Sequence, residues 1–420
     1  MGRATIIRNV RPTRDELTST GPSTLKVGRV AALGRKAFVL TDSPVAVALI
    51  AGAGGLVFVL LRLTVAAHGE ISFFIVAGTG HSTPGLMHPP IIVVPNNGYD
   101  GQFYYRMALD PADMALRAFG IELDSVSRLQ RIGYPAISWL LAGGRASLVP
   151  DTLVVTNVLG LAAIGYGGAL MARDSGRHAL WGVTVVAFWG YLWTAGRDLT
   201  EITAAAFLIL GLYAFRRERW LLAALLLLGA VLSKETCAYV VLVLAATRLV
   251  GWAVRRDRGF LTGADVAWVV PLVGFAGWQL VVFSVTGHLP LRSSGQANLG
   301  LPFEGVIDGF RLHVSGLPST ASAIWFVELA AFIVITVMAG LSLRSSSAPL
   351  HERLAWVAVV VLAVSTARGI WLGDVGFRSL DAVYLFSWLV LLGTSRRLLP
   401  LGGMVGLVWL GVAVELILYI

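Results

Sequence analysis

The densest polar and aromatic segment of an otherwise apolar chain is NNGYDGQFYYRMALDP, residues 96–111. Its asparagine pair and its proline bracket a short helix, with a cap at the start and a stop at the end. Asp100 then falls in the first turn, where the positive end of the helix dipole favours an ionised carboxylate that can accept a proton or bind a cation. In the alternative interpretation Asp100 only completes the helix cap, because acidic residues are common there.

An arginine pair follows in the same part of the chain. Arg128 and Arg131 are three residues apart, which places them on one helical face just before an apolar stretch. Guanidinium groups bind phosphate through paired hydrogen bonds, so the pair predicts a site for a lipid phosphate. Anchoring to ordinary anionic headgroups is the alternative. Arg106 is a weaker candidate for binding, since it could pair with Asp110 or Asp113.

Two later pairs of charged residues are further candidates for substrate binding. Asp198 and Glu201 have the spacing of a capping box, yet both carboxylates could also hold ligand hydroxyls. Lys234 and Glu235 lie between two short apolar runs, and a charge at the centre of a membrane costs about 2.5–3.5 kcal/mol, so charges at such places are functional candidates. A turn at the membrane edge, with both side chains reaching water, is the alternative.

Arg378 is a candidate for a second anion contact. It follows Gly373 and Gly376, two glycines that would allow the backbone to approach a ligand closely. Pairing with Asp374 or Asp381 is the alternative.

The sequence predicts no metal and no cofactor. The histidines of the predicted outer loops lack the i, i+4 or clustered Cys/His spacing of a zinc site. No Gly-Lys-Ser/Thr element is present, so energy from cytoplasmic ATP is not expected. Cys237 is the only cysteine, which excludes an intrachain disulfide.

Composition indicates a membrane protein. The 420 residues are 56% hydrophobic and 14% charged, far from the roughly one-quarter charged composition of soluble proteins. The mean hydropathy is +0.75. The net charge of +9 could suggest nucleic acid, but the basic residues are scattered in short clusters between apolar runs. They fit orientation signals better, and no nucleic-acid partner is predicted.

The predicted fold is an all-α polytopic membrane protein with about eleven transmembrane helices. Residues 1–43 form a basic, largely disordered cytoplasmic tail, and 44–420 form one transmembrane domain. Arginine clusters between spans place the N-terminus inside by the positive-inside rule. A long first outer loop, 68–133, carries short surface helices, and a second, 286–320, is rich in Gly, Ser and Pro. The spans are expected at 44–66, 149–171, 179–196, 201–215, 220–233, 236–252, 264–285, 321–343, 354–371, 381–394 and 402–420.

The acidic first outer loop, the number of spans and the basic residues placed for a lipid phosphate together resemble the glycosyltransferase C superfamily of integral membrane transferases. The motifs that carry the resemblance are similar to bacterial members implicated in surface glycopolymer formation. They lie at 99–105, 128–135, 198–201 and 234–235.

The resemblance implies a polyprenyl-phosphate-sugar donor, used on the outer face of the plasma membrane by an inverting displacement onto a cell-envelope glycan, lipid or protein. Asp100 would be the general base, and Arg128 with Arg131 would steady the departing lipid phosphate. The superfamily pattern has two adjacent acids, or an Asp with a nearby Glu, in that loop. Here no acid follows Asp100 before Asp110, which favours a metal-independent mechanism. Side chains of the same motifs would also contact substrate: Tyr99, Gln102, Tyr104 and Tyr134.

Two other classes of function remain open. A transporter or flippase of lipid-linked glycans would line its path with intramembrane charges such as Arg62, Lys234 and Glu235. A non-catalytic subunit of a surface-polysaccharide assembly complex would need no chemical step. The predicted grouping of charges outside the membrane, rather than in a line across it, favours the enzyme.

Overall fold

The computed structural model describes residues 41–87, 89–255, 262–371 and 377–418. The chain divides into Met1–Asp42 and Ser43–Ile420, and the described helices and strands belong to the second unit. Nearly all of the predicted basic tail, and the predicted glycine-containing turn before Arg378, lie outside the described residues.

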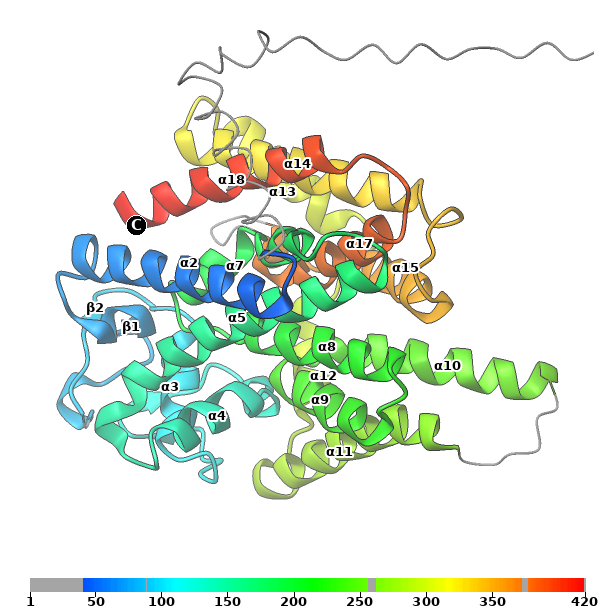
Figure 1. Ribbon diagram of the computed structural model, residues 1–420. Coiled ribbons are helices and arrows are strands. Elements are labelled where there is room, and N and C mark those ends of the chain that lie inside the picture. The colour runs from blue at the N-terminus through cyan, green and yellow to red at the C-terminus, as the bar shows by residue number, and fades with distance from the viewer. Residues whose placement is uncertain (1–40, 88, 256–261, 372–376, 419–420) are drawn as a thin grey trace, which may run out of the picture. The chain divides into compact units, whose positions relative to one another are not determined.

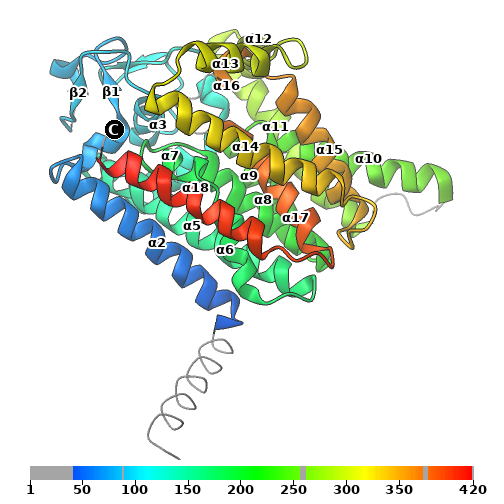
Figure 2. The same cartoon turned by 90° about the horizontal axis from the view of Figure 1, so that it is seen from above.

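The described chain is mostly helical, and it is embedded in a membrane through long apolar helices. Among the described residues, six helical segments are long and apolar enough to cross a bilayer. They correspond to α2 (Pro44–Val65), α5 (Val149–Asp174), α10 (Cys237–Arg255), α11 (Gly263–Thr286), α14 (Thr320–Gly340) and α18 (Leu399–Leu418). Figures 1 and 2 show α2 and α18 running alongside each other from two directions, and α2 also packs on α5.

Several predicted spans are shorter or broken helices. The predicted span 179–196 is divided into η5 (Ala179–Trp181), α6 (Gly182–Val186) and α7 (Gly190–Ala195). Gly182 packs directly on α5, where a Cβ atom would lie 2.4 Å from the backbone nitrogen of Ala169. This close tertiary packing leaves no sign in local hydropathy.

The predicted span 354–371 is also interrupted, between α15 (Leu350–Val364) and α16 (Arg368–Trp371). The hydroxyls of Ser365 and Thr366 donate to the carbonyls of Val361 and Ala363, and such local bonds compete with helix continuation. Shorter helices complete the core: α8 (Glu201–Arg216), α9 (Trp220–Ser233) and α17 (Asp381–Leu392). The described residues therefore do not confirm eleven continuous spans.

The first loop, 68–133, is folded and partly buried rather than laid on a surface. It contains two small paired-strand elements, β1 (Ala77–Gly78) with β2 (Val93–Val94) and β3 (Arg117–Ala118) with β4 (Ile121–Glu122). Its helices are η1 (Ile71–Ile75), η2 (Pro84–Leu86), α3 (Gly101–Leu109) and η3 (Val126–Gln130), after which α4 (Gly133–Leu141) leads to η4 (Ala146–Leu148) and α5.

Every residue of α3 is buried, so the prediction of surface helices is wrong for this segment. The reason is that α3 presents large apolar or aromatic side chains on all sides, including Phe103, Tyr104, Tyr105 and Met107, and such helices bury themselves. α3 therefore lies in the core of the first loop.

The predicted second loop, 286–320, also has helices of its own. These are α12 (Pro290–Asn298) and α13 (Glu304–Ser315). α12 packs on η3 of the first loop, and both α12 and α13 contact α16, as Figure 2 shows. α12 thereby joins the two loops above the start of α10.

Candidate functional site

Asp100 lies immediately before α3 and faces two arginines. One of its carboxylate oxygens, Oδ2, lies 2.8 Å from Arg128 Nη1 and 3.1 Å from Arg378 Nη2. It makes no side-chain capping bond, so the interpretation of Asp100 as a simple cap is wrong. The Asn cap is wrong as well, because the Asn96 side chain accepts from the backbone N–H of Gly98 in a turn that precedes the helix. Local turn chemistry therefore leaves the Asp100 carboxylate for tertiary contacts.

Electrostatics keep Asp100 ionised. Burial by itself would raise its pKa, but Arg128, Arg378 and Arg131 outweigh this and lower the pKa to about 2. The Asp100 side chain is 17% exposed, whereas those of Glu201, Glu235 and Asp381 are all below 10%. Asp100 is thus the most accessible of these four carboxylates.

Arg378 connects Asp100 to a second, more deeply buried group of charges. Its guanidinium donates to the Tyr99 hydroxyl at 3.2 Å and to the Glu201 carboxylate. Glu201 Oε1 in turn lies 3.7 Å from Lys234 Nζ, which donates to Asp381 at 2.7 Å. Lys234 is only 3% exposed, so the interpretation of a turn whose side chains reach water is wrong.

Arg131 belongs to the same charge cluster. The cluster consists of Asp100, Asp124, Arg128, Arg131, Glu201, Lys234, Glu235, Arg378 and Asp381, with Ser294 beside it. The Arg131 guanidinium forms a bidentate pair with Glu235, at 2.8 and 2.7 Å, and donates to the Tyr104 hydroxyl at 3.0 Å. Close packing brings these segments together, since a Cβ atom on Gly133 would lie 2.4 Å from Ser233 Oγ at the end of α9. Ser294 of α12 donates to Glu235 at 3.0 Å.

Both predicted phosphate-binding arginines are therefore engaged by carboxylates in this structure. Arg128 pairs with Asp124 through two hydrogen bonds of 2.8 and 2.7 Å as well as with Asp100. An anion that binds here has to share or displace these carboxylates, and Asp100 and Asp124 are the more exposed ones.

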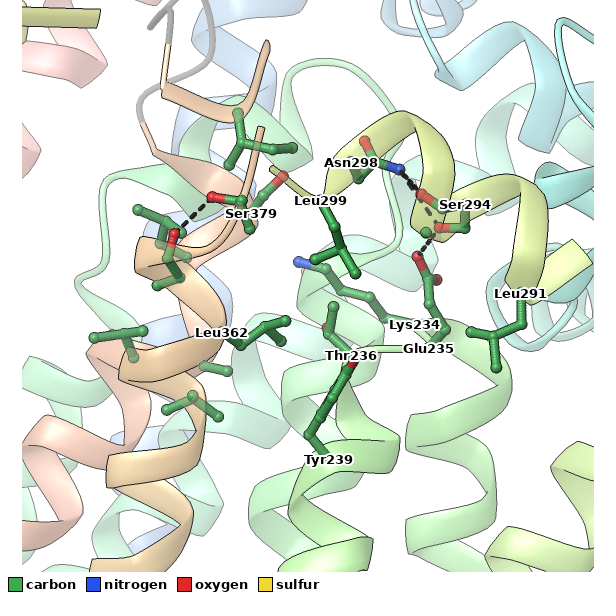
Figure 3. A pocket seen from close by; sticks show the side chains of 18 of the residues that line it. Lys234, Glu235, Thr236, Tyr239, Leu291, Ser294, Asn298, Leu299, Leu362 and Ser379 are labelled. Atoms are coloured by element: carbon green, nitrogen blue, oxygen red, sulfur yellow. Dashed lines mark hydrogen bonds between the residues drawn. The ribbon is translucent and has the colours of Figure 1, made fainter. Parts of the chain in front are cut away.

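A cavity adjoins the buried charges, between α10, α12, α15 and the start of α17. Figure 3 shows Lys234 and Glu235 reaching into its polar end, where Ser294 and Asn298 of α12 are hydrogen-bonded to each other. Its remaining walls are mostly apolar, and the space not filled by atoms is about 820 Å³. The apolar lining includes Tyr239, Leu291, Leu299, Val359, Leu362, Ala363, Ile370 and Val383. The cavity thus has one charged end and one apolar end.

Three predicted contact residues hold the first loop together instead of joining the cluster. Arg106 is fully buried and donates to the backbone carbonyls of Asp113 and Ala115. Gln102 accepts from the Gly78 backbone and from Ser82, and donates to the Asn97 carbonyl. The Tyr134 hydroxyl donates to the carbonyl of Leu153 and accepts from Asn157. These hydrogen bonds tie the loop to itself and α4 to α5.

Asp198 is also apart from the cluster. It is fully buried, with a positive φ of 51°, and neither carboxylate oxygen has a hydrogen-bond partner among the described residues. Helix α8 begins at Glu201 with Thr200 before it, so the predicted capping box is wrong. Burial raises the pKa of Asp198 well above its usual range, and the neighbouring Tyr134 hydroxyl offsets this only in part. Burial therefore favours the protonated form of Asp198.

We expect Asp198→Asn to be tolerated, and increasingly so as the pH rises. The wild-type side chain keeps its proton when folded but loses it on unfolding above about pH 3.9, so wild-type stability falls as pH rises from there towards the folded-state pKa. Asn does not ionise and lacks this loss. Thermal unfolding of both purified proteins at pH 5, 7 and 8.5 should show the melting temperature of the variant rising relative to that of the wild type. If the variant instead becomes less stable relative to the wild type as the pH rises, Asp198 is ionised in the folded protein.

Sequence reasoning missed three members of the cluster as site residues: Asp124, Asp381 and Ser294. Asp124 precedes Arg128 by four residues, a spacing at which opposite charges often pair. Asp381 starts an apolar helix, the same signal that singled out Lys234. Ser294 carries no such signal. Among the described residues no three or more His, Cys, Asp and Glu side chains converge as a metal-ligand set.

Comparison with known protein families, with characterised proteins and with solved structures finds no match to this chain.

Proposed function

We propose that this protein is an inverting, metal-independent membrane glycosyltransferase that uses a polyprenyl-phosphate-sugar donor. Its acceptor is a glycan, lipid or protein of the cell envelope, at the outer face of the plasma membrane, and it uses no cofactor. The observation that carries the proposal is Asp100: an ionised carboxylate, more accessible than its buried partners, bracketed by Arg128 and Arg378.

The reaction needs a base for the acceptor and a cationic environment for the leaving group. The acceptor hydroxyl oxygen forms a bond to the anomeric carbon while the bond from that carbon to the phosphate oxygen breaks. The hydroxyl proton passes to Asp100, and the electron pair leaves with the lipid phosphate, which needs no acid because it carries its own charge. Arginines near Asp100 stabilise the growing negative charge on that phosphate.

The low basicity of Asp100 gives donor binding a second role. With a pKa of about 2, the carboxylate is a weak base while Arg128 holds it. A lipid phosphate that takes over hydrogen bonds from Arg128 or Arg131 reduces the positive field at Asp100 and so raises its basicity. In this mechanism the base becomes effective only when the donor is bound.

The cavity beside the cluster has the chemistry of the donor. A polyprenyl phosphate has a dianionic or monoanionic head on a long apolar chain, and the cavity joins Arg131 and Lys234 to a wall of leucine, valine and alanine on α15. A donor phosphate bound at the polar end of this cavity would lie beside Arg131, whose guanidinium also contacts Glu235 and Tyr104.

The proposed orientation is open to a labelling experiment. In a Cys237→Ser background, which removes the buried native thiol, single cysteines are placed at the exposed positions Thr83, Gln296 and Ser347. The first two should react with a membrane-impermeant thiol reagent in whole cells and the third should not, because Arg344 and Arg353 mark its side as cytoplasmic. The reverse pattern would invert the topology and place Asp100 inside the cell.

The direct test of function uses the full-length protein purified in detergent and a panel of polyprenyl-phosphate sugars. Release of free polyprenyl phosphate that depends on an added envelope acceptor is the expected result. Movement of intact lipid-linked glycan across vesicles, with no release, would identify a flippase instead. Release by neither route from any donor in the panel would reject the transferase.

A further inference from the structure

The first loop contains a second cavity, beside β1 and the β3–β4 hairpin, which has about 1000 Å³ of open space. Figure 1 shows where β1 lies relative to α3. The lining includes Thr79, His81, Ser82 and Thr83 on one side and Arg117, Phe119 and Glu122 on the other. None of these residues belongs to the charge cluster or to the cavity beside it.

The aromatic ring of Phe103 lies between a residue of this cleft and the residues around Asp100. The His81 imidazole packs edge-on against Phe103, with ring centres 5.3 Å apart. The Arg128 guanidinium lies over the same Phe103 ring, 5.0 Å from its centre, and contacts Asp100. Tyr104 contacts Arg131 beside the cavity of Lys234. Consecutive residues of α3 thus contact residues that line two different cavities, His81 and Arg131, and Asp100 immediately precedes that helix.

The lining of the cleft suits a neutral carbohydrate. Threonine hydroxyls, an imidazole and the Arg117–Glu122 pair supply both donors and acceptors, and the two charges of that pair balance each other. Phe119 adds an aromatic surface that is 39% exposed. A sugar ring has an apolar C–H face and a rim of hydroxyls, so it complements an aromatic side chain surrounded by polar groups. A phosphate would find no uncompensated cation in this lining.

The Phe119 side chain is displayed by a tight turn. Phe119 and Gly120 have φ values of +52° and +77°, as a two-residue hairpin loop between β3 and β4 requires. A glycine would adopt this conformation at position 119 more easily than phenylalanine does. Strained backbone of this kind persists where the surrounding structure fixes it.

We propose that this cleft binds the acceptor of the transfer reaction, a neutral, hydroxyl-rich glycan. Binding of the glycan to the cleft does not depend on catalysis. The role of the glycan as acceptor rests on the proposed function. The acceptor hydroxyl would enter past His81 and Phe103, and the donor from the cavity of Lys234, so that the two substrates meet at Asp100.

The test measures glycan binding by the full-length protein in detergent micelles, using saturation-transfer NMR. The probes are methyl glycosides and short oligosaccharides of neutral hexoses and pentoses. Phe119→Ala should weaken binding by about tenfold, the scale of losing one aromatic contact. Thr83→Trp, which fills the cleft from a second side, should abolish it. Phe303→Ala is the matched control, because Phe303 is also an exposed phenylalanine with positive φ but lies before α13.

Loss of binding in Phe119→Ala and Thr83→Trp but not in Phe303→Ala supports the assignment. Equal binding by all four proteins, or no binding of any probe by the wild type, overturns it. Release of polyprenyl phosphate, measured separately, keeps the two proposals distinct. Glycoside binding at the cleft without release rejects the transferase alone, while release with an unchanged acceptor KM in Phe119→Ala rejects the cleft alone.

Discussion

Replacing Asp100 with Asn is expected to lower the rate of sugar transfer by about 10²- to 10⁴-fold, the usual contribution of a general base. The amide keeps the shape of the carboxylate and an oxygen that can accept from Arg128 or Arg378, but it cannot take the acceptor proton. The rate of transfer from a polyprenyl-phosphate sugar, at matched protein levels, is the measurement.

Asp124→Asn is the matched control for this experiment. Asp124 pairs with the same guanidinium of Arg128 and is 31% exposed, but of the two carboxylates only Asp100 also contacts Arg378 among the described residues. Removing its charge also reduces the electrostatic hold on Arg128, so a general electrostatic effect would appear in both variants. If Asp100→Asn keeps more than about a tenth of the wild-type rate, or falls no further than Asp124→Asn, Asp100 is not the base.

The sequence predicted the individual helices better than it predicted their continuity. The span 220–233 matches α9 residue for residue, and 264–285 matches α11 to within one residue at each end, because arginine clusters and turns flank these apolar runs. The division of 179–196 into three short helices escaped prediction, and so did the close packing of Gly182 on the backbone of α5. Such a contact joins segments that local patterns treat separately.

The candidate site could be predicted as residues but not as a network. Lys234 and Glu235 were singled out as charges between apolar runs, Glu201 by its spacing from Asp198, and Arg378 by the glycines before it. Their partners were not predictable, because the contact of Arg378 with Asp100 joins residues 278 positions apart. At Arg106 the alternative of pairing with Asp113 is confirmed, at 3.4 Å, and the backbone carbonyls of Asp113 and Ala115 complete its contacts.

The assembled cluster is close to charge balance. Its five carboxylates and four cations differ by one charge, and they are Asp100, Asp124, Glu201, Glu235 and Asp381 with Arg128, Arg131, Lys234 and Arg378. Buried charges need such partners, and a donor phosphate that enters the cluster upsets the balance by at least one negative charge. Asp100 contacts both Arg128 and Arg378, so its basicity rises when a phosphate takes over hydrogen bonds from Arg128. In the proposed mechanism, donor binding and base activation are therefore coupled through the same arginines.

Lys234→Met is expected to destabilise the protein by about 3–5 kcal/mol, the cost of leaving a buried carboxylate without its partner. Lys234 is 3% exposed, and its Nζ donates to Asp381 at 2.7 Å and lies 3.7 Å from Glu201. Methionine fills similar space without the charge, so Asp381 loses its cation and Glu201 keeps only Arg378. Chemical unfolding of the detergent-solubilised protein measures the loss.

Two further variants decide whether the pair itself is responsible. Combining Lys234→Met with Asp381→Asn removes both charges and should recover a large part of the loss, since an uncharged pair has no stranded carboxylate. Arg311→Met is the control, because the Arg311 side chain is 76% exposed and pairs with Asp308 at 3.7 Å on the surface of α13. That variant should cost less than about 1 kcal/mol. A Lys234→Met protein as stable as the control would show that the buried pair does not hold the end of α9 and the start of α17 together.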